Sequence, residues 1–343
     1  MAVIWDAGIA LQAGLGTLLC AAILLSLDSI HPGNGPVSHV IEGPGISATS
    51  TASSSQPQVA SSGALMTVVG VFVVTDVKVK HSFGEYEAWL AAYLESVSSP
   101  LVLYLANYDA EKVRRMRGSR PLIIREVASA WELPHAADMW SEYVGPQWSM
   151  DPERTIHQPE LYAIWNAKAA LLAEVAEANP FLTRYFSYLD VGMFRNGALP
   201  GWPDDERVHE LFARQHNAMA FGIVEPIKAL ESIAASYAAA KPQYKDAGWR
   251  RFVTLIGGFF AGEASAVQRF AREFYEILQS AAAAGAFVGK DQDIMNYIAA
   301  RDYGDKQSIF VGGGGCGDVW FFITHYLRAT NRTTCDATSF GSG

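Results

Sequence analysis

Asp190 is the first residue whose type and position could do chemistry. It ends the apolar segment Phe186–Asp190 (FSYLD), which predicts a strand, and Val191-Gly192 follows directly. Ligands of α/β sheets bind beyond the carboxyl ends of the strands, so this carboxylate is expected where a ligand would lie. Gly192 would let a phosphate or a sugar approach the backbone closely. The alternative is an aspartate that only initiates a turn.

Lys168 carries a positive charge on the apolar side of a predicted helix. It lies seven residues after Leu161 and shares a helical face with Leu161, Ile164 and Trp165. A buried ammonium is costly unless it meets an anion, so Lys168 is a candidate partner for a diphosphate beside Asp190. Alternatively, its stem follows the apolar surface and its ammonium reaches water.

A run of small residues follows the predicted strand Phe252–Ile256. The run is Gly257-Gly258-Phe259-Phe260-Ala261-Gly262. Its glycines Gly257, Gly258 and Gly262 would allow a bulky polar ligand such as a sugar to come close. The two phenylalanines either form a stacking wall or fill the core.

Asp291-Gln292-Asp293-Ile294-Met295-Asn296 opens a further predicted helix. Aspartate is an ordinary N-cap, so this segment has a purely structural interpretation. Taken with Asp190, Lys168 and the glycine run, it instead predicts a polar pocket with carboxylates, one cation and little steric obstruction. Such a pocket suits a nucleotide-sugar.

Composition excludes several other classes of protein. The chain has 343 residues, of which 50% are hydrophobic and 18% charged, with a formal net charge of -9. This excludes a disordered or collagen-like chain, and the acidic balance without lysine or arginine blocks argues against a nucleic-acid partner. Three cysteines cannot build a disulfide framework. The glycine run Gly312–Gly315 lacks the lysine of a P-loop, and no nucleophile elbow or dinucleotide-binding glycine pattern occurs.

The elements that must position these residues alternate between strands and helices. Strands are predicted at Met66–Asp76, Pro100–Leu105 and Pro121–Ile124, and helices at 84–97 and from Pro159 to Asn179-Pro180. The stretch 204–248 is expected to be a mostly helical insertion between two strands. This alternation predicts an α/β fold with a mostly parallel sheet covered by helices on both faces.

The first 63 residues differ in character from the rest. Ala7–Leu27 is an uncharged run of 21 residues, and a helix of that length would span the roughly 30 Å of a bilayer core. A buried helix or a cleaved signal peptide is the alternative. Residues 29–63 are rich in Ser, Gly and Pro and predict a flexible stem. The predicted organisation is a membrane anchor at 1–28, a disordered stem at 29–63 and a globular domain at 64–343.

Two features near the carboxyl terminus fit a lumenal domain. Asn331-Arg-Thr333 is an acceptor sequence for glycosylation, and Cys316 and Cys335 could pair in an oxidising compartment. With the single-pass anchor, they predict a membrane protein of the Golgi or the endoplasmic reticulum.

The sequence also resembles a known family. VFVVTDVKVKHSFGEYEAWL, LYAIWNAK, the LDVG-x-FR segment, GGFFAG and KDQDIMNYI, which span roughly Met66 to Arg328, resemble the HtrL/YibB-type family with its WlaTC-like members. That family is identified as glycosyltransferases. The order of strand aspartate, glycine turn and DQD-x-x-N is also similar to glycogenin-like transferases of the GT-A fold.

The resemblance implies a GT-A domain, a Rossmann-like sheet that binds a nucleoside-diphosphate sugar. Asp190 would stand at the metal-binding Asp-x-Asp motif, although Tyr188 replaces its first aspartate. If Mn²⁺ or Mg²⁺ is used, it would bridge the diphosphate. His325 would be a further metal ligand, and Asp291 and Gln292 would face the sugar as catalytic or hydroxyl-binding groups. The resemblance also implies that the loop with Asp76, Lys78 and His81 holds the nucleotide.

The predicted activity is transfer of a sugar from a nucleoside-diphosphate donor to a hydroxyl of a glycan, lipid or protein. Lys168, backbone amides and a metal at Asp190 would stabilise the charge of the departing diphosphate, and Asp291 would act as the base. The main alternative is an inactive protein of the same fold that binds a glycan or a partner. A hydrolase with paired carboxylates is a second alternative.

Overall fold

The computed structural model describes residues 63–75, 81–136, 146–224, 232, 235, 255–303, 307–312, 318–328 and 339–342. The chain divides into two units, 1–55 and 56–343, and all described residues lie in the second. The predicted anchor and nearly all of the predicted stem lie outside the described residues. Among the described residues, no helix combines the length and the hydropathy that a membrane span requires.

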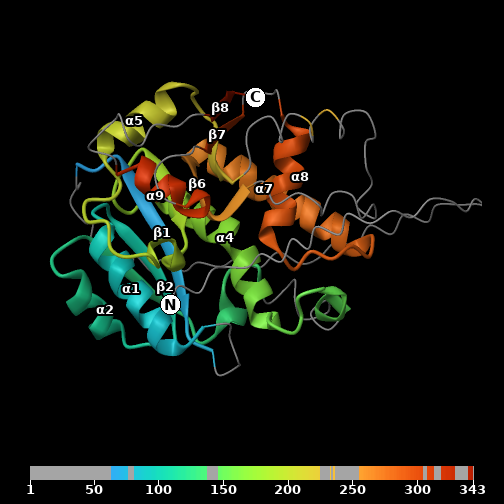
Figure 1. Ribbon diagram of the computed structural model, residues 1–343, viewed down its shortest axis with the longest axis horizontal. Helices are drawn as coiled ribbons and strands as arrows, with labels where there is room; N and C mark the ends of the chain where they lie inside the picture. Colours follow the sequence, from blue (N-terminus) through green and yellow to red (C-terminus); the bar gives the residue numbers. More distant parts are fainter. Residues whose placement is uncertain are drawn as a thin grey trace, which may run out of the picture. The chain divides into compact units, whose positions relative to one another are not determined.

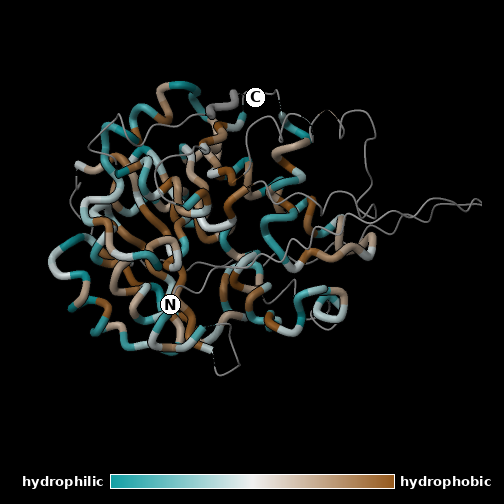
Figure 2. The backbone as a smooth tube through the Cα atoms, in the orientation of Figure 1, coloured by the Kyte–Doolittle hydropathy of each residue, from teal (hydrophilic) through white to brown (hydrophobic). Residues whose placement is uncertain are grey.

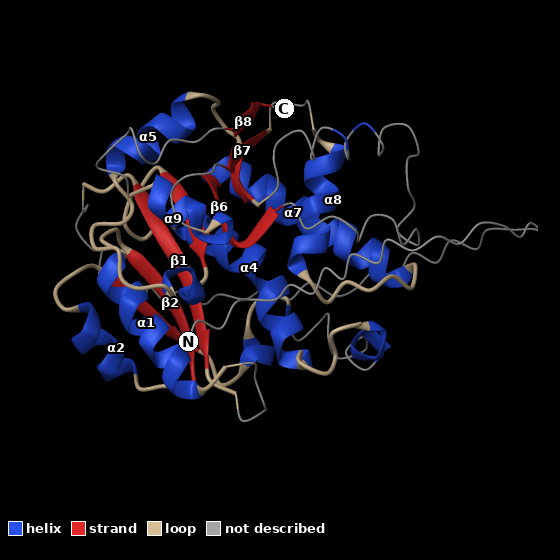
Figure 3. Cartoon of the chain, in the orientation of Figure 1, coloured by secondary structure: helices blue, strands red, loops and turns tan. Residues whose placement is uncertain are grey.

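An eight-stranded sheet forms the centre of the second unit (Figures 1 and 3). Its strand order is β3-β2-β1-β4-β6-β5-β7-β8. Six strands point the same way, whereas β6 and β8 run antiparallel to their neighbours. The bounds are β1 (Met66–Val73), β2 (Leu101–Ala106), β3 (Leu122–Glu126), β4 (Tyr185–Leu189), β5 (Met219–Ile223), β6 (Leu255–Glu263), β7 (Ser308–Gly312) and β8 (Ser339–Ser342).

Helices cover both faces of the sheet, as the alternating pattern predicts. They are α1 (Phe83–Ser96), α2 (Ala110–Arg117), α4 (Pro159–Ala178), α5 (Asp205–Ala213), α7 (Ala264–Ala283), α8 (Asp291–Arg301) and α9 (Phe322–Tyr326). Among the described residues, short 3₁₀ helices join them at η1 (Ala130–Glu132), η2 (Val191–Phe194) and η4 (Val319–Phe321). The fold class predicted from the sequence, α/β with a mostly parallel sheet flanked by helices, is confirmed.

Local sequence explains where the two key helices begin and end. A capping box starts α1, because the Ser82 side chain accepts from the N–H of Glu85 and the Glu85 side chain accepts from the N–H of Ser82. Pro159 occupies the first turn of α4, where the absence of an N–H costs nothing. Asn179 ends α4 in the left-handed conformation (φ 37°), which asparagine tolerates better than most residues.

Strand alternation divides the interior into two cores. Along β1, Val69 and Val71 pack on the face that α4, α7 and α8 cover, which we call the α4 core. Met66, Val68 and Phe72 pack on the opposite face, the α1 core, beside α1, α5 and α9. Because both faces are covered, β1 and β2 are hydrophobic and buried along nearly their whole length, as Figure 2 shows for the central strands.

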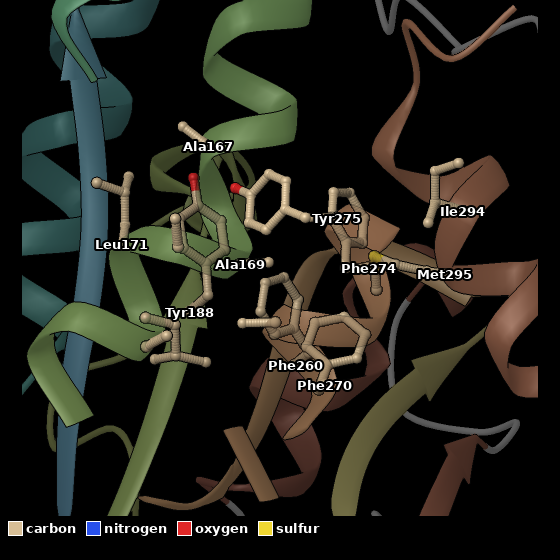
Figure 4. Close-up of a cluster of buried hydrophobic side chains, with 14 of the residues drawn as sticks. Ala167, Ala169, Leu171, Tyr188, Phe260, Phe270, Phe274, Tyr275, Ile294 and Met295 are labelled. Carbon is tan, nitrogen blue, oxygen red and sulfur yellow. The ribbon is translucent and has the colours of Figure 1, made fainter. Parts of the chain in front are cut away.

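Aromatic side chains dominate the α4 core (Figure 4). The ring of Tyr188 on β4 stacks on that of Phe260 on β6 with a centroid distance of 5.4 Å, and Phe270 of α7 lies 5.3 Å from Phe260. Phe274 and Tyr275 extend this cluster along α7. The phenylalanine pair of the glycine run is therefore core, since Phe259 and Phe260 are both buried.

Two local predictions are wrong. The segment Gly257–Gly262 does not follow a strand but lies inside β6, which continues to Glu263. The stretch 204–248 is also not an insertion between two strands of the sheet, because its residues Met219–Ile223 form β5, which is itself a sheet strand between β6 and β7. In both cases pairing with neighbouring strands decides the conformation, which local propensity cannot reveal.

The sheet reverses its winding direction between β1 and β4. From β1 the chain proceeds through β2 to β3 at one edge, then returns to place β4 on the other side of β1. These two strands are parallel and pair from Met66 with Tyr185 to Val69 with Tyr188, so β1 continues to Val73 past the end of β4, and Asp190 follows β4 directly. Such a reversal point is where open α/β sheets bind ligands.

Candidate active site

Three of the predicted residues meet at the carboxyl end of β4. The ammonium nitrogen Nζ of Lys168 lies 3.1 Å from Oδ2 of Asp190 and 2.9 Å from Oδ2 of Asp291. The same nitrogen donates to the carbonyl of Gly257 at 2.9 Å. Asp190 and Asp291 thus share one cation, although they lie 22 and 123 residues after Lys168 in the chain. We call Lys168, Asp190 and Asp291 the lysine–carboxylate cluster.

Exposure separates the members of this cluster. The side chain of Lys168 is 3% exposed and that of Asp291 is 6% exposed, whereas that of Asp190 is 37% exposed. Lys168 therefore does not extend to water, and the anions that it meets are the carboxylates of Asp190 and Asp291. Its predicted contact with a diphosphate stays a prediction. Only Asp190 presents its carboxylate to a ligand in solution.

The charge states of Lys168 and Asp291 follow from their burial and from the two ion pairs of Lys168. Burial lowers the pKa of Lys168, but Asp190 and Asp291 outweigh it and raise the pKa above its ordinary value. Burial raises the pKa of Asp291, and Lys168 opposes this increase only in part. The ammonium is consequently protonated throughout the physiological range, and it holds two carboxylates together.

Strand alternation directs Asp190 toward α4. Tyr188 and Asp190 are two residues apart and share a face of β4, and the Tyr188 hydroxyl donates to Oδ1 of Asp190 at 2.9 Å. The Lys168 ammonium also lies 5.3 Å from the centre of the Tyr188 ring. Burial and the nearby Asp190 raise the pKa of Tyr188 well above its ordinary value, so the hydroxyl stays a donor.

Gly257 and Gly258 create room inside the protein rather than for a ligand. Because β6 is antiparallel to β4, its first residues lie beside the end of β4, and the N–H of Asp190 donates to the Gly258 carbonyl at 2.9 Å. A Cβ on Gly258 would lie 2.7 Å from Sδ of Met193 and 3.3 Å from Oδ2 of Asp190. A Cβ on Gly257 would lie 2.7 Å from Cγ of Gln292. The glycines thus let the cluster pack against the strand.

The start of α8 places Asp291 and Gln292. The N-cap residue of α8 is Lys290, whose side chain makes no capping hydrogen bond. Asp291 is the first residue of the helix and is therefore not its N-cap. Oδ1 of Asp291 instead accepts from the N–H of Gln292, and the Gln292 side chain donates to the Leu255 carbonyl at 2.8 Å. Oδ1 of Asn296 accepts from the Leu255 N–H and fixes α8 to β6.

The other predicted site residues lie apart from this cluster. Gly262 pairs with Phe186, near the start of β4 and away from Asp190. His81 contacts the ring of Trp89 at 4.8 Å and lies 3.5 Å from Glu85. Burial and then Arg328 lower the pKa of His325 in α9. Asp76 and Lys78 lie outside the described residues.

Gly192 contacts Arg195, a cationic residue near Asp190 that was not predicted from the sequence. The Arg195 guanidinium lies 4.9 Å from the centre of the Trp89 ring and 5.1 Å from that of Phe321. Its Nε donates to the Gly192 carbonyl at 3.0 Å. The arginine five residues after Asp190 was visible in the LDVG-x-FR segment, but nothing local indicates which rings it would meet.

A second acidic group occurs before α4. Within the ranges that the structure describes, Asp151, Glu153 and His157 are the residues of the His/Cys/Asp/Glu types that lie close enough in a group of three to hold a metal ion. Neither Asp190 nor His325 belongs to that group. The D-x-E-x₃-H spacing was a usable signal in the sequence, since metal ligands commonly cluster in this way.

This acidic group already has protein partners. Oδ2 of Asp151 accepts from the Tyr162 hydroxyl at 2.6 Å and lies 2.8 Å from Nδ1 of His157. Oδ1 of Asp151 accepts from the N–H of Glu153 at 2.7 Å, and the Glu153 carboxylate pairs with Lys290. The network joins the segment before α4 to the residue before α8, next to Asp291.

A groove of about 460 Å³ lies between α4 and α7. His135, which stacks on Tyr275 at 4.3 Å, forms part of its wall, together with Glu174, Glu177 and Arg272. None of the lysine–carboxylate cluster lines it.

No family model matches the chain, and no curated protein matches it. Among solved structures, the chain is similar to core-mannan synthase A of Aspergillus fumigatus in its Mn/GDP form. The two are 11% identical, the match covers 72% of each chain and the TM-score is 0.41. The resemblance to the HtrL/YibB-type family stays a prediction.

Proposed function

We propose that this protein is a glycosyltransferase of the GT-A type that transfers a sugar from a nucleoside-diphosphate donor to an acceptor hydroxyl. The observation that carries the proposal is the lysine–carboxylate cluster at the point where the sheet reverses direction. A buried ammonium that pairs with an exposed carboxylate is not needed for hydrophobic packing, and such pairs are concentrated at functional sites. The resemblance to the HtrL/YibB-type family supports the same proposal.

The reaction requires the site to stabilise negative charge on the leaving diphosphate and positive charge on the sugar. The bond between the anomeric carbon and the phosphate oxygen breaks, and its electron pair leaves with the diphosphate. The acceptor oxygen forms the new bond to that carbon, and its proton passes to the exposed carboxylate of Asp190. The sugar resembles an oxocarbenium ion in between, so a nearby carboxylate stabilises it.

Asp190 is the carboxylate that suits this role. It is the exposed member of the cluster, and both of its oxygens are held, Oδ1 by Tyr188 and Oδ2 by Lys168. A carboxylate fixed in this way needs little reorganisation as charge develops. Asp291 is too buried to reach an acceptor hydroxyl directly, and we assign it the positioning of Lys168.

The residues around Asp190 do not fit a divalent cation well. A metal at Asp190 and Asp291 would need the oxygens that Lys168 holds at 3.1 and 2.9 Å. An ammonium and a divalent cation repel each other and compete for the same carboxylate oxygens. In the proposed reaction Asp190 therefore acts together with Lys168 and without a metal ion, and Mn²⁺ or Mg²⁺ at Asp190 and His325 stays a prediction from the sequence.

A catalytically inactive protein of the same fold is the second candidate. The observation that favours it is the engagement of both Asp190 oxygens by protein groups, which resembles a structural ion pair as much as a catalytic one. Such a protein would bind a glycan or a nucleotide-sugar without turnover.

A panel of nucleotide-sugars tests both candidates. The purified full chain is incubated with UDP-, GDP-, CMP- and ADP-linked sugars, with Mn²⁺ or with EDTA, and release of the nucleotide and thermal stabilisation are recorded. Turnover of one donor supports the transferase. Stabilisation without turnover, in the presence of an acceptor panel, supports the binding protein. Absence of both overturns the proposed function.

We further propose that residues 1–28 anchor the protein in a Golgi or endoplasmic reticulum membrane, with the domain in the lumen. This rests on the uncharged run Ala7–Leu27 and on the acceptor sequence Asn331-Arg-Thr333. Glycosidase treatment of the protein from its native host should increase its gel mobility, whereas Asn331→Gln should already migrate at the faster position. Equal mobility before and after treatment would contradict the lumenal placement.

A further inference from the structure

Arg195 lies on the side of Asp190 opposite to Lys168. Lys168 and Asp291 approach Asp190 from α4 and α8, over the α4 core. Arg195 ends η2, the 3₁₀ helix that begins directly after Asp190, and its aromatic contacts Trp89 and Phe321 belong to the α1 core. The two cations thus flank the end of β4 from opposite faces of the sheet.

The Arg195 guanidinium is held in a fixed plane. The guanidinium carbon lies 4.9 Å from the centre of the Trp89 ring and 5.1 Å from the centre of the Phe321 ring. Its Nε donates to the Gly192 carbonyl. A Cβ on Gly192 would lie 3.2 Å from Nη2 of Arg195, so the glycine is part of this fit. Aromatic rings on a guanidinium cover its apolar faces and leave recognition to its edge.

Charge at the site shows why a second cation is needed. Lys168 has one positive charge and contacts two carboxylates, so the lysine–carboxylate cluster has a formal charge of -1 when all three are ionised. A diphosphate brought beside it meets net repulsion. Arg195 adds one positive charge near Asp190, which removes the net negative charge of the cluster and offers the diphosphate a local cation. Burial lowers the pKa of Arg195, and Coulomb attraction from Asp190 partly offsets that effect. Asp318 of the η4 cap also attracts Arg195.

We propose that Arg195, clamped between Trp89 and Phe321, binds the diphosphate of the donor and takes the part that a divalent cation would otherwise play. The inference rests on the proposed function and deepens it, because it names the group that neutralises the leaving diphosphate. Arginine suits this role, since its planar edge donates two parallel hydrogen bonds to phosphate oxygens. Donor binding then does not require a divalent cation.

Isothermal titration of nucleoside diphosphates into the full-length protein tests this inference. UDP, GDP, ADP and CDP are titrated in EDTA and again in Mn²⁺. At least one of them should bind in EDTA, with a Kd within about threefold of that in Mn²⁺. In EDTA, Arg195→Gln should weaken its binding at least tenfold, whereas the matching nucleoside without phosphates should bind both proteins equally.

Arg184 provides a matched control. It too lies over an aromatic ring, that of Tyr185 at 5.2 Å, and pairs with Glu263, but it sits before β4 at the end of the strand far from Asp190. Arg184→Gln should leave the Kd unchanged. Thermal melting of both variants shows whether they are folded.

The outcomes separate the two levels of the proposal. Binding that disappears in EDTA, or an equal Kd for Arg195→Gln and the wild type, would overturn the role of Arg195 and leave the glycosyltransferase standing. If no nucleoside diphosphate binds under either condition, the proposed function fails, and the role of Arg195 fails with it.

Discussion

The two acidic groups beside α4 contain similar residues in different circumstances. The lysine–carboxylate cluster and the Asp151–Glu153–His157 group each combine two carboxylates with a cationic partner. In the second group the buried Asp151 has protein partners on both oxygens, and the side chain of Glu153 is 45% exposed. In the first, the exposed Asp190 is fixed by a lysine that is itself buried.

Under the proposed function, this difference separates a ligand site, the lysine–carboxylate cluster, from a structural network, the Asp151–Glu153–His157 group. Carboxylates alone do not, because both groups have them. A buried charge that holds an exposed one is the informative combination, since burying Lys168 costs free energy that folding alone does not require. We therefore expect substitutions in the first group to change activity, and to change stability as well where the substituted side chain is buried, whereas those in the second should change stability only.

Lys168→Met should have the largest effect. It leaves Asp291 buried without its cation, and breaking a buried ion pair typically costs about 3–5 kcal/mol of the free energy of unfolding. Urea unfolding followed by circular dichroism measures this. The matched control is Lys290→Met, whose pair with Glu153 is much more exposed and is expected to contribute less than about 1 kcal/mol. Equal losses in the two variants would remove the distinction between the groups.

The same lysine gives a pH dependence. Its folded-state pKa is raised, so its contribution to stability is complete below the ordinary lysine pKa of about 10.4 and declines as pH rises through the folded-state value. The difference in stability between wild type and Lys168→Met should therefore be constant from pH 7 to 9 and shrink only at higher pH. A difference that already falls near pH 7 would show that the ammonium is not held by its carboxylates.

Asp190→Asn should lower sugar transfer at least about 100-fold, because loss of a preorganised charge at the reacting centre costs about 3 kcal/mol. Its melting temperature should change little, since the side chain is 37% exposed and asparagine has the same shape. Initial rates with the donor found in the panel measure the effect. A rate above one tenth of the wild-type value would remove Asp190 from the reaction.

Gly258→Ala and Gly262→Ala form a pair on one strand. Each Cβ would approach a methionine sulfur at 2.7 Å, Met193 in the first case and Met219 in the second, so both should destabilise the protein by a similar amount, about 1–2 kcal/mol. Only the first also comes within 3.3 Å of Oδ2 of Asp190. Transfer rates should therefore fall about tenfold for Gly258→Ala and stay near wild type for Gly262→Ala. Equal rates would indicate that the position of Asp190 is not critical.

Asp151→Asn should have the smallest effect on transfer, none in the folded variant, while it costs about 1–3 kcal/mol of stability from weakened hydrogen bonds to Tyr162 and His157. Burial alone would raise the pKa of Asp151, but the hydrogen bonds from Tyr162, the Glu153 N–H and His157 lower it. Its contribution is thus present above the unfolded-state pKa of about 3.9 and is lost as pH falls through the folded-state value. The stability difference should be full at pH 7 and vanish in acid, with the transfer rate of the folded variant unchanged.

Part of the site was predictable because neighbouring residues determine it. The apolar run that ends at Asp190 and the lysine on the apolar face of α4 each marked one half of the ion pair. The segment before α8 was also identified, although as a helix cap rather than as the second carboxylate on Lys168. Arg195 was missed, because its neighbours Trp89 and Phe321 are more than 100 residues from each other in the chain.

By itself the sequence determined the helices α1, α4 and α8, the strands β1 to β4 and the α/β class, since hydrophobic periodicity and capping residues act over a few positions. Only the tertiary structure decided that β6 runs antiparallel beside β4, which places Gly257 and Gly258 against the lysine–carboxylate cluster. It also decided that one ammonium serves two carboxylates from distant segments. The physical reason is that strand order and charge pairing depend on contacts between remote parts of the chain, which become favourable only once the two cores have formed.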